Sequence, residues 1–206
     1  MSIDVWFAFA AACVVVLMIP GPTILLVCSY ALSAGRRAGL WMVFGVAMGD
    51  LVAMTASVLG LGALLLSSAE LFTLLRWIGA AYLLYLGWKL WRAPVDDATR
   101  SEAPRLSGPK MALHAFAVTA TNPKGIIFFV AFVPQFIDPA SALAPQLTVM
   151  VATFVGLAAL NAGFFALLAD KMGQRIARPS VRRAVNRVGG GALMAMGVLA
   201  ALSKRA

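Results

Sequence analysis

Long apolar stretches separated by short polar segments dominate the chain. Six such stretches cover residues 3–34, 39–66, 71–91, 111–137, 144–169 and 185–202. Each is long enough for a helix that crosses a bilayer core of roughly 30 Å. The pattern therefore predicts an all-α membrane protein with six transmembrane helices.

The composition supports this fold class and narrows the possible partners. Apolar residues make up 62% of the chain and charged residues 12%, compared with roughly 45–50% and about 25% in soluble domains. The net charge of +9 alone would suggest nucleic acid, but the basic residues lie between apolar runs rather than on a soluble folded face. We therefore expect a lipid bilayer as partner, and no nucleic acid.

The basic residues also predict the orientation, because Lys and Arg accumulate in cytoplasmic loops. Every second connection is basic; these connections contain Arg36, Arg37, Lys89, Arg92, Arg100, Arg105, Lys110, Lys171, Arg175, Arg178, Arg182, Arg183 and Arg187. The opposite side has only Arg76, Lys204 and Arg205. Both termini are therefore predicted to lie outside the cytoplasm.

A polar segment divides the chain into two halves that resemble each other. Residues 94–110 are rich in Pro, Ser, Gly and charge, which is typical of a solvated linker. It separates 1–93 from 111–206, and three pairs of motifs recur in the same order: Gly21-Pro22 with Asn122-Pro123, Gly45 and Asp50 with Gly156 and Asn161, and the glycines of 79–87 with those of 189–197. Three helices per half place the halves in opposite orientations, which predicts an inverted 3+3 repeat, common among secondary transporters.

The first and fourth predicted helices contain corresponding interruptions. Pro20 and Pro22 remove backbone donors and Gly21 relaxes the steric limits between them. We expect the first helix to break near mid-membrane and to restart at Pro22, which would direct free N–H groups towards a carboxylate. The hydroxyl of Thr23 would add a polar contact. A kink that only improves packing is the alternative.

The fourth helix repeats this logic at Asn122-Pro123-Lys124. Asn122 is expected to cap the second half-helix. An ammonium near mid-membrane costs at least about 2.5–3.5 kcal/mol, so Lys124 should face the interior of the bundle. Asp50 lies at a similar depth, where it would pair statically with Lys124, bind a substrate ammonium or carry a proton. Asn161, at the equivalent position, would bind substrate or form an interhelical hydrogen bond.

The constellations of an enzyme are missing from the sequence. His114 is the only histidine, so a histidine-based metal site or catalytic triad lacks parts, and we expect an ordinary interfacial residue there. No nucleotide fingerprint is present. The sequence therefore predicts neither an enzyme nor a cofactor or metal. The alternatives to amino-acid export are the export of a divalent cation or another small metabolite and, less favoured, a non-transporting scaffold. A single membrane aspartate supplies few oxygen ligands for a divalent cation, and a scaffold would not need Asp50 or Lys124 at depth.

Several motifs together resemble the LysE/RhtB amino-acid exporter family. They are Pro20-Gly21-Pro22, residues 45–50, residues 77–83, Asn122-Pro123-Lys124 and residues 128–136, and they span essentially the whole chain. The resemblance implies a bacterial inner-membrane exporter of amino acids or close derivatives, driven by the proton gradient and often a homodimer. Thr23 departs from the family's pattern, in which Asn or Asp commonly follows the second proline, so the resemblance does not identify the substrate.

Overall fold

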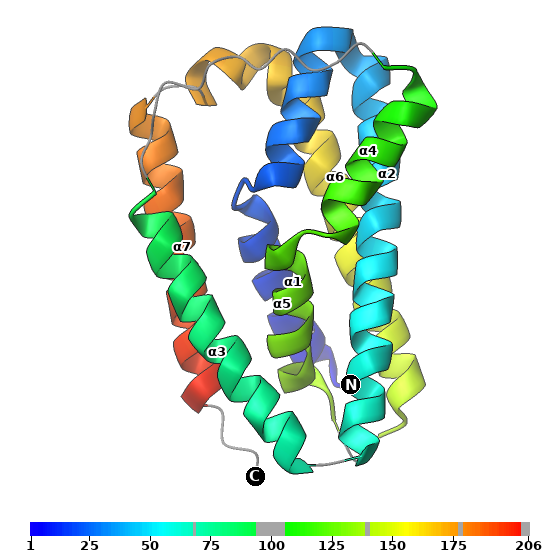
Figure 1. The fold of residues 1–206 in the computed structure, drawn as a ribbon, viewed down its shortest axis with the longest axis vertical. Coiled ribbons are helices and arrows are strands. Elements are labelled where there is room, and N and C mark those ends of the chain that lie inside the picture. The colour runs from blue at the N-terminus through cyan, green and yellow to red at the C-terminus, as the bar shows by residue number, and fades with distance from the viewer. Residues whose placement is uncertain (68, 94–105, 139–140, 177–178, 203–206) are drawn as a thin grey trace.

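The computed structural model describes residues 1–67, 69–93, 106–138, 141–176 and 179–202, and every regular element in these ranges is a helix. The helices run along the long axis of an elongated bundle (Figure 1). The fold is therefore all-helical, as predicted. Most of the predicted linker, 94–105, lies outside the described residues, as do Lys204 and Arg205.

The first predicted helix consists of two separate segments. Helix α1, Ile3–Met18, ends at Ile19, whose backbone is extended, and α2, Pro22–Ser67, begins at the second proline. Proline cannot donate to the preceding turn but fits the first turn of a new helix, which explains both the end and the restart. The predicted interruption is present.

A single glycine turns α2 back on itself. Gly35 has φ 76° and ψ −171°, a combination that essentially only glycine adopts without strain. Figure 1 shows the chain reversing direction here. Helix α2 therefore supplies both the second part of the first predicted helix and the whole of the next one.

The rest of the chain forms α3 and then the second half. The elements are α3 Ala69–Trp91, α4 Gly108–Ala120, α5 Pro123–Ala131, the 3₁₀ turn η1 Val133–Phe136, α6 Leu143–Ile176 and α7 Pro179–Leu202. The α4 and α5–η1 segments are bent by 47° relative to each other. The fourth predicted helix is thus interrupted at Thr121–Asn122.

The described helices include clear candidates for membrane spans. By length and apolar composition these are Pro22–Gly60 and Leu143–Ala169, together with the bent pair Gly108–Ala120 and Pro123–Phe136. Since Pro22–Gly60 contains the reversal at Gly35, it accounts for more than one predicted run. Six passes and the inverted relation of the two halves remain predictions.

Glycines allow two pairs of helices to approach closely. A Cβ atom at Gly49 of α2 would lie 2.7 Å from Cβ of Thr119 and 2.9 Å from the carbonyl oxygen of Phe116 in α4. At Gly190 of α7 it would lie 2.8 Å from the backbone nitrogen of Trp91 in α3. Small residues at such contacts are typical of helix packing in membranes.

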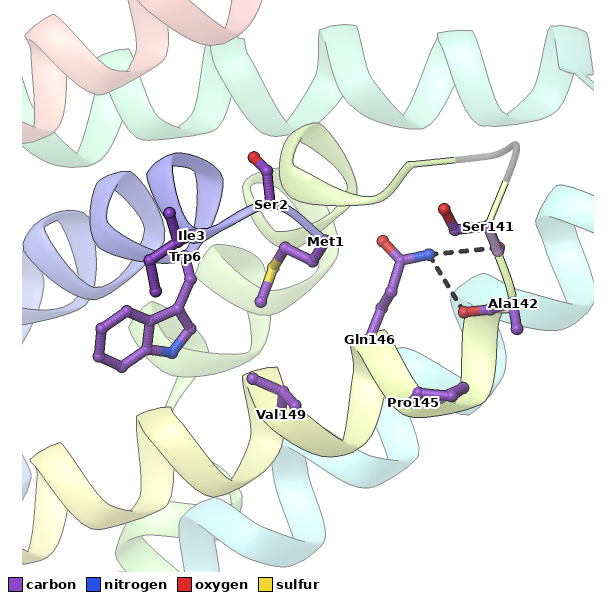
Figure 2. A pocket seen from close by; sticks show the side chains of 9 residues that line it. All are labelled: Met1, Ser2, Ile3, Trp6, Ser141, Ala142, Pro145, Gln146 and Val149. Carbon is purple, nitrogen blue, oxygen red and sulfur yellow. Dashed lines mark hydrogen bonds between the residues drawn. The ribbon is translucent and has the colours of Figure 1, made fainter.

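A hollow of about 710 Å³ lies where α1 and α6 begin, and Trp6, Gln146 and Val149 are among its lining residues (Figure 2). The amide nitrogen of Gln146 donates to the carbonyl oxygens of Asp138, Ser141 and Ala142. No predicted site residue lines this hollow. Its buried amide organises the turn before α6.

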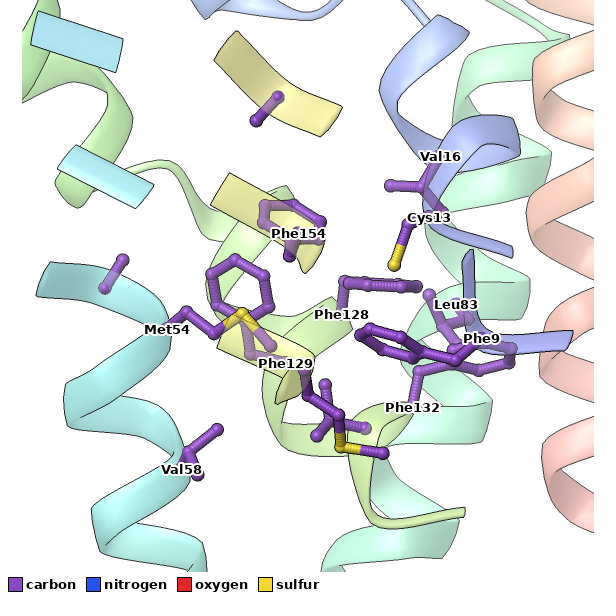
Figure 3. Close-up of a cluster of buried hydrophobic side chains, with 14 of the residues drawn as sticks. Phe9, Cys13, Val16, Met54, Val58, Leu83, Phe128, Phe129, Phe132 and Phe154 are labelled. Atoms are coloured by element: carbon purple, nitrogen blue, oxygen red, sulfur yellow. The ribbon is translucent and has the colours of Figure 1, made fainter. Parts of the chain in front are cut away.

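Two apolar clusters form the core. The α1–α5 cluster contains the aromatic side chains drawn in Figure 3, and its members include Phe9, Cys13, Val16, Met54, Leu83, Phe128, Phe129, Phe132, Met150 and Phe154. The α2–α4 cluster consists of Ile24, Val27, Tyr30, Ala38, Met42, Val46, Met111, Ala115 and Ala162. The first cluster contains residues of α1, which precedes the first break, and of α5, which follows the second. The second cluster contains residues of α2 that follow the first break and residues of α4, which precedes the second. The breaks therefore lie between the two clusters.

Candidate functional site

The two helix breaks meet at Thr23, on the first turn of α2. The Thr23 hydroxyl oxygen accepts a hydrogen bond from the side-chain nitrogen of Asn122 at 3.2 Å and from the Thr119 hydroxyl at 3.4 Å. The Asn122 side-chain oxygen accepts from the backbone nitrogen of Lys124 at 3.1 Å, so Asn122 caps α5 as predicted. These contacts join residues about a hundred positions apart into one polar cluster.

The Lys124 ammonium binds the end of α1. Its Nζ donates to the carbonyl oxygens of Ile19 at 2.9 Å and Val16 at 3.2 Å. Carbonyl groups at a helix C-terminus lack partners in the helix and carry partial negative charge, so they favour a cation. The ammonium also lies against Gly21, where a Cβ atom would be 3.5 Å from Nζ. It retains a third N–H for which no protein acceptor is found among the described residues.

Asn161 of α6 binds the same helix end. Its side-chain nitrogen donates to the carbonyl oxygen of Leu17 at 3.0 Å. This is the interhelical hydrogen bond that was one of its two predicted roles. Two side chains from the second half of the chain therefore hold the C-terminal turn of α1.

Asp50 is buried between the two apolar clusters. Only 8% of its surface is exposed, with Val46 of one cluster and Ala53 of the other on either side along α2. Lys124 is close enough for its charge to act on the carboxylate. Within the part of the chain that the structure describes, however, Asp50 makes no hydrogen bond and no ion pair of 4.0 Å or less. The static pair with Lys124, the binding of a substrate ammonium and proton transfer therefore all remain predictions for Asp50.

The remaining predicted site residues lie either at the two breaks or at the boundary between the two apolar clusters. Pro22 and Pro123 begin α2 and α5, and Gly21 lies against the ammonium of Lys124. Asn161 is flanked along α6 by Ala158 of one cluster and Ala162 of the other, as Asp50 is flanked on α2.

Sequence reasoning missed Thr119 and the carbonyl groups at the end of α1. Nothing in the sequence distinguishes one backbone carbonyl from another. A signal for Thr119 was available, because Gly45 and Gly49 lie one turn apart on α2 and such spacing marks a surface for close helix contact. It did not reveal which helix packs there.

Comparison with known proteins gives a consistent result over nearly the whole chain. The LysE type translocator family matches residues 14–204. An uncharacterized membrane protein of Vibrio cholerae is 37% identical over 99% of this chain and its own full length. A homoserine/homoserine lactone efflux protein of Salmonella typhimurium is 29% identical over the full length of both chains. An uncharacterized membrane protein of Pseudomonas aeruginosa is 36% identical over 72% of this chain and 70% of its own. No solved structure gives a significant match.

Proposed function

The chain belongs to the LysE type translocator family, and from that premise we propose that it exports amino acids or close derivatives across the bacterial inner membrane. The export is driven by the proton gradient. The named efflux relative from Salmonella typhimurium, which aligns from end to end, supports this substrate class.

The observation that carries the proposal is the buried Asp50 carboxylate, which makes no hydrogen bond and no ion pair of 4.0 Å or less with any residue that the structure describes. An isolated carboxylate in an apolar interior is strongly disfavoured unless it is neutralised or paired. The charge of Lys124 acts on Asp50 without a direct ion pair among the described contacts, so the carboxylate can also bind a proton or a cationic group from outside the chain. The ammonium group of an amino acid is such a cation.

Groups that can bind the carboxylate of an amino acid lie at the first break. The start of α2 presents backbone N–H groups, and Lys124 has one N–H for which the described residues provide no acceptor. Helix N-termini and ammonium groups both favour carboxylates. A zwitterionic amino acid would therefore bind with its carboxylate at Lys124 and Thr23 and its ammonium group at Asp50.

Competition between a proton and the substrate for Asp50 couples proton entry to substrate export. A protonated carboxyl no longer attracts an ammonium group, so proton and substrate occupy Asp50 in turn. If the two apolar clusters separate alternately, Asp50 releases the substrate to the outside, takes up a proton there and releases the proton to the cytoplasm. One proton then enters for each substrate that leaves, by the alternating access common in such transporters.

Efflux from proteoliposomes tests this proposal. Vesicles are loaded with a labelled amino-acid mixture that includes homoserine, and release is measured with and without an imposed pH gradient. We expect gradient-stimulated release by the natural protein. Asp50→Asn should lower it about tenfold or more, because truncating one partner of a buried charge pair costs about 2–5 kcal/mol. Lys124→Ala should also lower it.

Matched controls are available in the chain. Asp4 lies exposed on the first turn of α1 and Lys110 lies exposed on α4, so Asp4→Asn and Lys110→Ala should keep the release of the natural protein. Full gradient-stimulated release by Asp50→Asn would remove Asp50 from the mechanism. Absence of any release by the natural protein would contradict export of the amino acids in the mixture.

A further inference from the structure

A second polar contact joins the broken helices away from the site. Tyr30 of α2 and His114 of α4 place the hydroxyl oxygen 3.0 Å from Nδ1. The two rings are nearly perpendicular, with centroids 5.9 Å apart. Neither residue belongs to the cluster around Thr23. The contact connects the segment after the first break to the segment before the second.

The surroundings of this contact are apolar. Tyr30 is fully buried, and so are Val27, Met42, Ala115 and Ala162 of the same α2–α4 cluster. His114 itself is half-buried, so the contact is partly buried. Loss of His114 would leave the hydroxyl group of the buried Tyr30 without this partner, which costs free energy. Tyr30 and His114 therefore favour a closed α2–α4 interface more strongly than apolar contacts alone would.

The α2–α4 cluster lies between the site around Thr23 and the predicted cytoplasmic end of the bundle. Its members on α2 lie on both sides of the reversal at Gly35, between Thr23 at the site and Asp50. Arg36 and Arg37 follow this reversal, which makes it the predicted cytoplasmic end. A molecule that enters from the cytoplasm must pass the α2–α4 cluster to reach Thr23.

The other side of the site is closed differently. The α1–α5 cluster consists of apolar side chains, and aromatic pairs such as Phe9 with Phe136 and Phe128 with Phe132 contact each other there. Such contacts are non-directional and tolerate sliding, whereas a hydrogen bond requires defined geometry. The two closures therefore differ in kind.

We propose that the hydrogen bond between Tyr30 and His114 is the latch of the cytoplasmic gate. The latch must open before substrate enters from the cytoplasm, and in this role it rests on the proposed export function. Tyr30 and His114 are positioning residues, because they act on the packing of α2 against α4 and do not touch the site around Thr23.

The chain contains a reporter thiol at each closure. Cys28 is half-buried and packs against the α2–α4 cluster, whereas Cys13 is fully buried in the α1–α5 cluster. Both thiols are free. The rates at which a water-soluble maleimide modifies them, resolved by mass spectrometry of the two peptides, therefore report separately on the two closures.

The test uses inside-out membrane vesicles that contain the full-length protein. Tyr30→Phe removes only the hydroxyl group and should raise the modification rate of Cys28 about two- to tenfold, the factor that corresponds to one net hydrogen bond. The rate at Cys13 should stay unchanged. Tyr85→Phe is the matched control, because Tyr85 is an exposed tyrosine on α3, and it should change neither rate.

A second variant keeps the test decisive if Tyr30→Phe misfolds and exposes both thiols. His114→Leu removes the other partner and should raise the Cys28 rate by a similar factor. The double variant should not exceed the larger single effect, because both changes remove the same bond. An unchanged Cys28 rate in the single variants, or an equal rise at Cys13 in folded protein, would overturn the latch.

The thiol measurement is independent of transport. If the natural protein releases amino acids but Tyr30→Phe leaves the Cys28 rate unchanged, the latch is wrong and the export function stands. If the Cys28 rate rises as expected but no amino acid is released, the export function is wrong, and the contact still controls access from that side.

Discussion

The carbonyl groups at the end of α1 accept hydrogen bonds from Lys124 and Asn161, whereas the end of α4 is closed by its own neighbours. There the Thr121 hydroxyl donates to the carbonyl oxygen of Ala117 and the Asn122 backbone nitrogen to that of Thr119. The two breaks are therefore chemically unequal. Asp50, which the predicted repeat pairs with Asn161, makes no corresponding hydrogen bond to a helix end among the residues that the structure describes.

Replacement of Lys124 by Met tests how strongly the ammonium holds α1. The change leaves the carbonyl group of Ile19 without the Lys124 donor, whereas the carbonyl oxygen of Val16 still accepts from the backbone nitrogen of Ile19 at 3.3 Å. An unsatisfied buried group costs about 1–3 kcal/mol. Relief from burying a charge offsets part of this loss. We expect Lys124→Met to lower the free energy of unfolding in detergent by about 1–3 kcal/mol.

The matched control is Lys110→Met on the exposed side of α4, which should stay within about 0.5 kcal/mol of the natural protein. Equal stability of the two variants would show that the ammonium of Lys124 does not anchor the end of α1. A transport defect would then have to come from its charge alone.

Contacts between helices bring Asp50 to the same height along the bundle as the two helix breaks. Gly45 and Gly49 let α4 approach the backbone of α2, since a Cβ atom at either position would collide with α4. Asp50 follows Gly49 directly, so this contact holds the part of α2 that carries Asp50 against the last turn of α4. The reversal at Gly35 returns α2 past its own beginning, which brings Asp50 back towards the break at Gly21.

A methyl group at Gly49 tests this contact. Gly49→Ala should lower the free energy of unfolding by about 1–3 kcal/mol, the usual cost of overpacking. It should also slow transport, because α4 and Thr119 are displaced from α2. The measurements are unfolding in detergent and gradient-driven efflux.

The control for this change is Gly156→Ala in α6, where a Cβ atom would meet nothing within 4 Å. It should be neutral or should stabilise the helix by up to about 1 kcal/mol, because Ala is the better helix former. If Gly49→Ala is as stable as Gly156→Ala, the close approach of α2 and α4 is not required.

At the scale of the whole molecule, the site lies between two apolar clusters that separate it from the two ends of the bundle. Asp50 and Asn161 occupy the boundary between these clusters on α2 and α6. The arrangement suits a transporter, because each cluster is able to exclude water from the site while the other opens. A homodimer and the location in the inner membrane remain predictions from the family resemblance.

The orientation in the membrane is tested by two single-cysteine variants in a chain with Cys13 and Cys28 replaced by Ser. Ser2→Cys and Arg37→Cys both lie at exposed positions, on opposite sides of the predicted membrane. A membrane-impermeant maleimide should label position 2 in spheroplasts and position 37 only in inside-out vesicles. The reverse pattern would place the basic loops outside the cytoplasm and contradict the prediction from their charge.

The sequence by itself determined the features that depend on local chemistry. The helix break at Pro20-Gly21-Pro22 follows from the missing N–H groups of proline, and the start of α5 follows from the capping side chain of Asn122. The apolar runs determined the helical class because backbone groups in a membrane must be satisfied within the segment. These properties need no knowledge of the neighbouring helices.

Only the tertiary structure decided which groups meet. Lys124 donates to two carbonyl groups of α1, and His114, expected to be an ordinary interfacial residue, contacts the buried Tyr30. These partners are more than eighty positions apart, so their contact depends on how each helix is rotated and how closely it packs. Backbone carbonyls are chemically alike along the whole chain, and packing alone selects those that remain within reach of a donor.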